Sequence, residues 1–340
     1  MGFPIPDLQP ALPEIFLLSA DADNNYLGVG AQVLANALPP AILVADILEE
    51  IDSVLRVVGE PGAVEQLRFF WRRLCDVSAS FDDFYATLPE FIERLQALPR
   101  KADPSTCPRV VVTGDFFTRF SAFVIESVPD LYAENGIILK PVDLADLIQY
   151  GTYDGLAGAA QVLGMKPGGL AFAKACTRFF QPDGKKYLQQ WLTYQARRRI
   201  EDHYRGLFRR TGLLVAASND VSSLFVKASE HVSPALYGET IPTVGKGLDA
   251  DREGYDGIIV IGPFNCLPYR ISEAILKPLS IRQGMPILTY ESDGYPVSAS
   301  VLRQAEVHIQ QVLERSARRR ENSRSITERI SELFAAQTHP

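Results

Sequence analysis

The carboxyl-terminal two-thirds of the chain alternates two hydrophobic patterns. Short continuous apolar runs are typical of parallel strands buried on both faces, whereas apolar residues that recur every three or four positions indicate amphipathic helices. The runs predict strands at residues 110–113, 137–139, 258–261 and 286–289. Because strand, loop and helix repeat in this order from residue 109 onward, we expect an α/β fold with a doubly wound, mostly parallel sheet and helices on both faces.

Helical spacing dominates the chain before the predicted sheet, from Leu27 to about Leu98. The sequence therefore predicts a helical layer that precedes the α/β unit. We expect a mostly helical partial domain at 1–107, a doubly wound α/β domain at 108–318, and a charged carboxyl-terminal helix or tail at 319–340.

The same spacing predicts later helices at residues 123–135, 142–150, 184–210, 222–232, 270–283 and 301–313. Pro129 is expected to disturb the first of them. Residues 151–169 contain six glycines and are expected to be the loosest stretch, while residues 244–253 lead into the central strand. The 184–210 helix is densely basic at 197–199 and 209–210, and we interpret this basic face as a solvated surface.

Composition and charge narrow the classes of partner. The 340 residues carry a formal net charge of −7, which argues against a nucleic-acid partner because phosphate binding needs a basic surface. The sequence has no apolar run long enough to span a membrane and no signal peptide, so we expect a cytoplasmic protein with no membrane partner. Four scattered cysteines form no CxxC pair, and four histidines form no HExxH motif.

Three loops that follow predicted strands carry the candidate chemistry. Their reactive side chains are those of Asp115, Arg119, Cys266 and Asp293. The carboxyl ends of parallel strands lie on one edge of a sheet, so we expect these side chains to approach one crevice. The alternative is that the charged residues are loop caps and surface ion pairs, and that Cys266 is a small buried hydrophobe.

Familiar catalytic motifs are missing from these loops. No histidine lies near Cys266 in the sequence, so a cysteine–histidine nucleophile has no local support. No GxGxxG follows a strand, and the Gly245-Lys246-Gly247 turn precedes one, which disfavours dinucleotide and P-loop sites. No GxSxG elbow occurs, which disfavours an α/β hydrolase.

Two of the loops resemble those of a known family, the 2-hydroxyacyl-CoA dehydratases and benzoyl-CoA reductases. Gly-Asp-Phe-Phe-Thr-Arg at 114–119 is similar to the family loop that reads Gly-Glu, three residues, then Arg. Pro-Phe-Asn-Cys-Leu-Pro at 263–268 resembles the family's Pro-Phe-x-Cys-Met-Pro-Gly loop. The order of the intervening elements, including Tyr237-Gly238-Glu239, is also similar, and the likeness covers roughly residues 40–315.

The resemblance implies a fold, a cofactor and a partner. Subunits of this family are doubly wound α/β proteins that hold an iron–sulfur cluster through cysteines, and an ATP-hydrolysing activase delivers low-potential electrons to that cluster. It implies electron transfer to a CoA-thioester or related substrate, with Cys266 as a cluster ligand. Asp115 and Arg119 would then shape the cluster pocket. Glu239 and Asp293 would support them from just outside it.

The chain departs from the family pattern at several positions. The family's amino-terminal cluster cysteines are absent, Asp115 replaces a glutamate, and Tyr269 replaces the glycine of the cysteine loop. Such clusters take about four ligands, so a homologous partner subunit or a second copy would have to supply the others. The alternative hypothesis is a cluster-less scaffold or accessory subunit of such a complex.

Overall fold

The structure, a computed structural model, describes residues 27–77, 81–121, 125, 127–215, 220–236 and 238–337, and the first 26 residues of the predicted helical domain lie outside this range. Its strands are β1 (Arg109–Gly114), β2 (Ile138–Pro141), β3 (Gly257–Pro263) and β4 (Ile287–Ser292). Its helices are α2 (Leu27–Val58), α3 (Ala63–Val77), α4 (Phe81–Gln96), α5 (Phe116–Phe120), α7 (Val128–Glu134), α8 (Leu144–Val162), α9 (Gly169–Thr177), α10 (Pro182–Phe208), α11 (Val221–Ser229), α12 (Thr240–Asp249), α13 (Leu267–Gln283) and α14 (Ala299–Gln337).

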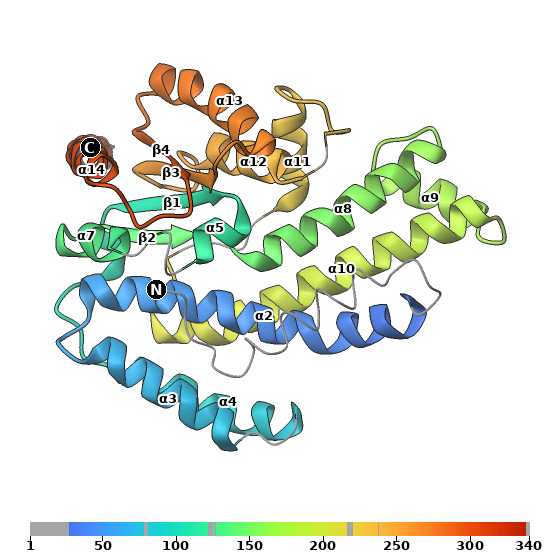
Figure 1. Cartoon of the computed structure of the whole chain (residues 1–340), viewed down its shortest axis with the longest axis horizontal. Helices are drawn as coiled ribbons and strands as arrows, with labels where there is room; N and C mark the ends of the chain where they lie inside the picture. Colours follow the sequence, from blue (N-terminus) through green and yellow to red (C-terminus); the bar gives the residue numbers. More distant parts are fainter. Residues whose placement is uncertain are drawn as a thin grey trace.

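The four strands form a parallel sheet in the order β2-β1-β3-β4 (Figure 1). In the register, Val112 of β1 lies beside Ile259 of β3, which lies beside Leu288 of β4. All four predicted strands are present, so the α/β fold with a parallel sheet is confirmed. The carboxyl ends of β1, β3 and β4 consequently lie side by side.

Alternation along each strand divides the core between the two faces of the sheet. Ile259 and Ile261 of β3 pack with residues of α7 and α14 on one face. Ile258 and Val260 pack with residues of α13 on the other face. The continuous apolar run in the sequence reflects burial on both faces.

The amino-terminal helices lie below the sheet in the view of Figure 1, and α2 runs beside both β2 and α10. Their shared core includes Ile47, Ile51 and Leu67 from α2 and α3 together with Phe208 of α10. The helical layer therefore combines segments from before and after the first βαβ unit.

Two predictions about irregular segments are wrong. The glycine-rich stretch at 151–169 is helical over most of its length, because α8 continues to Val162 and buries Leu156 and Ala160 against α9, α10 and α11. Gly245-Lys246-Gly247, expected to be a turn, instead lies inside α12, which continues to Asp249. In both segments tertiary packing outweighs the low helix propensity of glycine.

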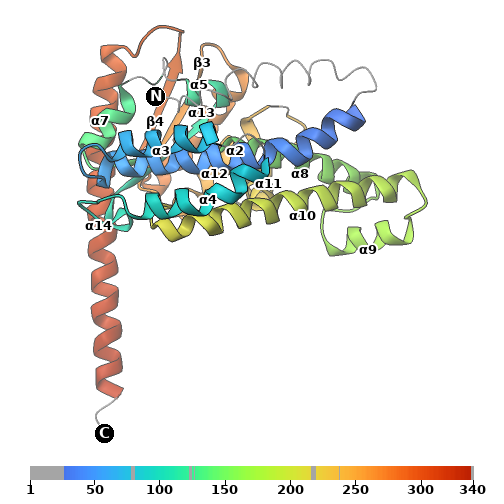
Figure 2. The same cartoon turned by 90° about the horizontal axis from the view of Figure 1, so that it is seen from below.

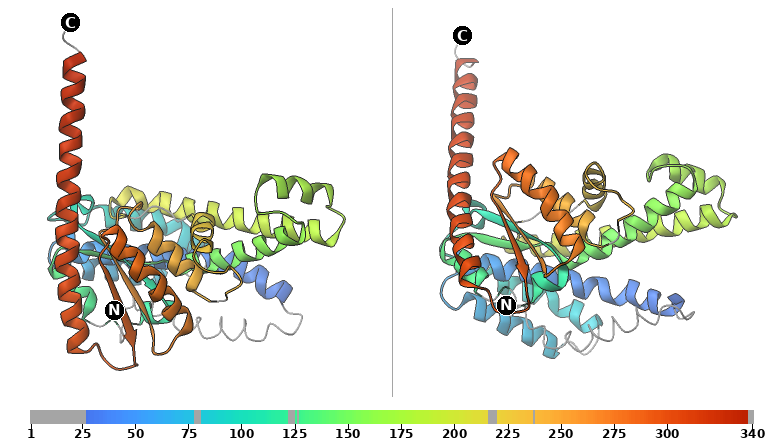
Figure 3. Two further views of the ribbon diagram at one scale, coloured as in Figure 1. Left: turned by 90° about the horizontal axis from the view of Figure 1, so that it is seen from above. Right: turned by 45° about the horizontal axis from the view of Figure 1, so that its top comes forward.

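Pro129 begins a helix rather than disturbing one, because it occupies the first turn of α7, where its missing N–H has no intrahelical partner to lose. The predicted closing helix and charged tail form one helix, α14, and its second half projects from the body (Figures 2 and 3). Across the described residues, none of the helices combines the length and apolar character needed to cross a membrane.

Candidate functional site

The loops after β1, β3 and β4 are joined by backbone and side-chain hydrogen bonds, and we call this region the carboxyl edge. The Asp115 N–H donates to the Ile261 carbonyl at 2.8 Å. The Phe264 N–H donates to the Ser292 carbonyl at 2.7 Å, and the Asn265 N–H donates to Glu291 Oε1 at 2.7 Å. The three candidate loops therefore form one continuous rim.

Gly114 makes the closest backbone approach in this rim. Its φ is +110°, and a Cβ built at this position would lie 1.9 Å from the Ile261 carbonyl oxygen. Only glycine avoids both the strain of this left-handed conformation and the clash. Gly114 thus brings Asp115 and α5 directly against β3.

Asp115 and Asp293 make local hydrogen bonds, as the loop-cap alternative expects. Asp115 Oδ1 accepts from the Thr118 N–H at 2.8 Å and from its hydroxyl at 2.6 Å, which caps α5. The exposed Asp293 accepts from the Tyr295 N–H at 3.1 Å. These contacts explain why an aspartate suits both positions without assigning a reaction to either.

Arg119 and Glu239 form the buried polar centre of the carboxyl edge. The Arg119 guanidinium donates to the carbonyls of Gly114 at 2.5 Å and Val142 at 3.1 Å, and its Nη1 lies 3.9 Å from Glu239 Oε2. The same carboxylate oxygen accepts from the Phe116 N–H at 2.7 Å. The pair therefore ties the start of α12 to the β1 loop.

The Glu239 carboxyl lies in an environment that disfavours its charge. Burial and the charge of Asp115 raise its pKa to about 7, although Arg119 partly offsets them. Its Oε1 is buried and has no hydrogen-bond partner among the described residues. The neighbouring Gly238 lies close to Pro268, where a Cβ would be 3.1 Å from the ring, so Glu239 adjoins the cysteine loop.

This raised pKa predicts a pH-dependent contribution of Glu239 to stability. Between pH 4.5, the usual pKa of the group, and about pH 7, the folded state binds the proton more tightly than the unfolded state does. The free energy of unfolding should therefore fall with rising pH over this range in the wild type, relative to Glu239→Gln. Urea titrations of both proteins from pH 4 to pH 8 would measure the difference. A constant difference would contradict the assignment.

Cys266 is half-buried at the position just before α13. Its side chain packs partly against the apolar cluster that contains Tyr269 and Leu276, while Phe264 and Leu267 on either side are exposed. Asn265 has a left-handed backbone, with φ of 58°. The thiol is neither fully enclosed nor fully open.

The residues around Cys266 do not by themselves fit an iron–sulfur cluster. Cys75 and Cys107 contact the helical core and Cys176 lies on α9, so Cys266 is the sole cysteine of the described carboxyl edge. Within the described residues, no group of three or more histidine, cysteine or acidic side chains has a metal-binding arrangement. Tyr269, where the family has glycine, packs its ring on Gly262 beneath the cysteine loop. A cluster at this position would need ligands from another chain.

A second polar region, not identified from the sequence, lies between the sheet and the helical layer. Lys140 and Arg205 both contact Glu50 and Asp143, at 3.6 Å and 3.2 Å for Glu50. Glu201 lies 3.5 Å from Arg205, and all of these side chains are buried. The available sequence signals were Lys140 inside an apolar run and Asp143 two residues after the end of β2.

Charges in this cluster strongly perturb one another. Burial alone would raise the pKa of Asp143, but Lys140 and Arg205 lower it to about 2. Burial and the neighbouring acids raise the pKa of Asp146 to about 6 and that of Glu201 to about 8. Strong perturbation is common at functional sites and also in structural ion networks. The central position and mutual pairing of these groups favour a structural role.

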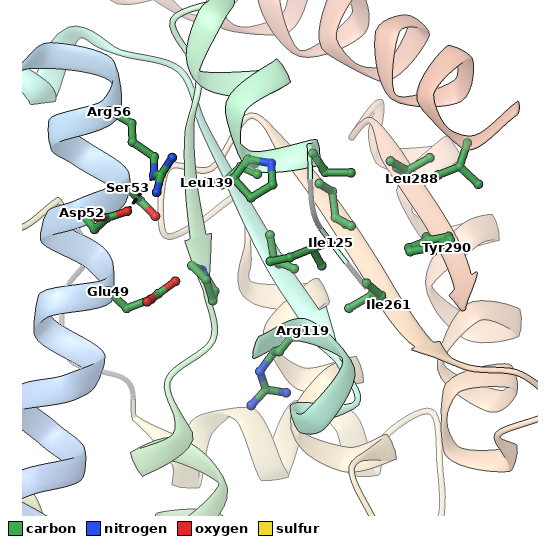
Figure 4. Close-up of a pocket in the computed structure, with 16 residues that line it drawn as sticks. Glu49, Asp52, Ser53, Arg56, Arg119, Ile125, Leu139, Ile261, Leu288 and Tyr290 are labelled. Carbon is green, nitrogen blue, oxygen red and sulfur yellow. Dashed lines mark hydrogen bonds and ion pairs between the residues drawn. The ribbon is translucent and has the colours of Figure 1, made fainter. Parts of the chain in front are cut away.

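A small cavity lies on the α7 and α14 face of the sheet (Figure 4). Glu49, Asp52 and Arg56 of α2 form its polar wall, and Leu139, Ile261 and Tyr290 lie among its apolar lining residues. Its volume is about 40 Å³, room for a few waters rather than a substrate. Arg119 lines one end, which connects the cavity to the carboxyl edge.

Comparisons with protein-family models, curated proteins and solved structures found no match. The resemblance carried by residues 114–119 and 263–268 therefore stays a prediction.

Proposed function

We propose that this chain is a cluster-less accessory subunit of a complex similar to the 2-hydroxyacyl-CoA dehydratases and benzoyl-CoA reductases. It would act in the cytoplasm, beside catalytic subunits that an ATP-dependent activase supplies with electrons. The observation that carries the proposal is a single half-buried thiol, Cys266, at an edge whose neighbouring side chains are exposed and apolar. This combination supports contact with another chain more than a complete redox centre.

Exposed apolar side chains follow three neighbouring strands at this edge. They are Phe117 after β1, Phe264 and Leu267 after β3, and Tyr295 after β4. Exposed apolar groups that gather at one place mark an interaction surface. In an accessory subunit, this surface would serve assembly and Cys266 would serve packing.

A second candidate function rests on the partial exposure of Cys266. In this alternative the thiolate is one ligand of an iron–sulfur cluster whose remaining ligands come from a partner subunit or a second copy. Arg119 and Glu239 would then lie next to the cluster, where the guanidinium would offset part of its negative charge. The two proposals share the interface and differ in whether Cys266 binds iron.

Anaerobic iron and sulfide analysis of this chain, co-expressed with a cysteine-bearing partner subunit, separates the two. For the accessory subunit, Cys266→Ser should leave iron content unchanged and cost about 1 kcal/mol of stability, as buried point changes commonly do. Cys176→Ser is the matched control, because Cys176 is exposed on α9. Loss of iron in Cys266→Ser but not in Cys176→Ser would overturn the accessory role and favour the ligand role, since serine replaces a soft thiolate poorly.

A further inference from the structure

A second small cavity lies between α2, α8 and α10, and we call it the three-helix cavity. These helices contact one another in pairs, and Figure 1 shows them running alongside each other. The cavity has a volume of about 20 Å³. Its walls combine apolar side chains with one carboxamide and one guanidinium, and the lining residues are Ile42, Leu43, Ala145, Ile148, Gln149 and Arg197.

The carboxamide in this cavity belongs to Gln149 of α8. Gln149 is 4% exposed, and its Oε1 is buried without a hydrogen-bond partner among the described residues. Buried polar side-chain atoms in folded proteins are nearly always paired, because an unpaired one costs its full desolvation. Gln149 therefore indicates that a polar group from outside the chain belongs in the cavity.

Arg197 of α10 brings a positive charge to the same cavity. Its Nη1 donates to the Ile148 carbonyl at 3.4 Å and to the Thr152 hydroxyl. Its Nε–H is buried and meets no acceptor within the part of the chain that the structure describes. Burial lowers the pKa of Arg197, and no described acidic side chain offsets this effect. The guanidinium thus has a free donor and lacks a counter-charge.

Other arginines that the fold buries do have a counter-charge. Arg119 lies beside Glu239, and Arg205 lies beside Glu50. Removing a charge from water is costly unless an opposite charge accompanies it. A water in the cavity could accept from the Nε–H of Arg197, but it would offset no charge. The missing group is therefore better matched by an anion than by a water.

The volume of the cavity limits the size of this anion. About 10–15 Å³ is enough for a single water, so about 20 Å³ suits one atom slightly larger than a water oxygen. A halide ion has this size, whereas a tetrahedral sulfate or phosphate is too large. The Gln149 carboxamide can turn so that its NH₂ group, rather than its oxygen, faces the anion. The apolar walls would strengthen the attraction by excluding water.

We propose that the three-helix cavity binds a single chloride-sized anion, held by the Nε–H of Arg197 and the NH₂ group of Gln149. The anion would join α8 to α10 at the point where Ile42 and Leu43 of α2 cover them. This site is separate from Cys266 and does not depend on the accessory role.

Chlorine NMR of the full-length chain tests the proposal, because the line of dissolved chloride broadens when the ion exchanges with a protein site. The wild type should give a broadening that saturates and that bromide removes. Arg197→Met should lose this saturable part, since it lacks the guanidinium. Gln149→Glu should lose it as well, because a carboxylate at this position would neutralise Arg197 from within the chain. Arg199→Met is the matched control, since it removes an equal charge from an exposed position of the same helix.

Three results would overturn the proposal. They are a wild type without saturable broadening, equal broadening in Arg197→Met and Arg199→Met, and displacement of chloride by sulfate as effectively as by bromide. The first two would leave only water in the cavity, and the third would place chloride on the open surface. Circular dichroism verifies that each variant is folded. Should Arg197→Met fail to fold, Gln149→Glu decides the test, because it keeps the arginine and nearly the same side-chain volume.

Discussion

Replacing Arg205 with methionine should lower the free energy of unfolding by about 3–5 kcal/mol, since it leaves buried carboxylates without their compensating charge. Arg205 contacts Glu50, Asp143 and Glu201, and each of these side chains is at most 4% exposed. Methionine keeps much of the volume but provides no charge. The loss of electrostatic attraction to these carboxylates should therefore cost more stability than the loss of packing.

The effect of Arg205→Met should grow as pH rises. Arg205 lowers the pKa of Asp143 and of Glu201, so its removal raises the pKa values of these acids in the folded variant. The variant then binds more protons than the wild type in the folded state and loses more stability as they dissociate. Urea unfolding at pH 5 and pH 8 should give the larger difference at pH 8.

Arg252 is the matched control for this substitution. It also pairs with a buried aspartate, Asp249, but its own side chain is 63% exposed. Arg252→Met should cost far less stability than Arg205→Met, because solvent screens an exposed ion pair. Equal losses for the two arginine variants, or a loss for Arg205→Met that does not change with pH, would contradict a buried charge network.

Replacing Gly114 with alanine should cost about 4 kcal/mol, the combined expectation for backbone strain and a broken buried hydrogen bond. The new Cβ would lie 1.9 Å from the Ile261 carbonyl oxygen, which accepts the Asp115 N–H. Neither atom is the end of a flexible side chain, so β1 and β3 would have to separate. Chemical unfolding measured by circular dichroism would report the loss.

Gly62→Ala is the control that separates the cost of backbone strain from the cost of the steric clash. Gly62 also has a left-handed backbone, with φ of +87°, but a Cβ there would meet nothing within 4 Å. This control should lose only about 1–2 kcal/mol, the cost of placing a side chain in the left-handed region. A Gly114→Ala protein that is as stable as Gly62→Ala would show that the rim between β1 and β3 is not rigid.

The strands were predictable from the sequence because both faces of the sheet are buried. Parallel strands covered on both faces need continuous apolar runs, and the run at Gly257–Ile261 has this property in the sequence itself. In the sequence, the loops that contain Asp115, Cys266 and Asp293 each follow one of these predicted strands. Parallel pairing brings the ends of such strands to one edge, so the arrangement of the rim followed from the fold class.

The glycine-rich helix α8 and the buried charge cluster were not predictable in this way. Local propensity disfavours a helix with glycines at 151, 155 and 158, and only contact with α10 and α11 overrides it. Arg205 follows a run of arginines that suggests a solvated face, yet it is 2% exposed. Its partners Glu50 and Asp143 are 155 and 62 positions away, a separation that no local pattern encodes.

The sequence by itself determined the alternation of strands and helices, the position of the reactive loops and the scarcity of cysteines near Cys266. Those features depend on neighbouring residues, whose periodicity and order can be read along the chain. Tertiary structure decided which charges are buried, which apolar side chains stay exposed at the carboxyl edge, and which oxygen of Glu239 lacks a partner among the described residues. Burial and pairing are properties of surfaces brought together from distant segments, so they exist only in the folded chain.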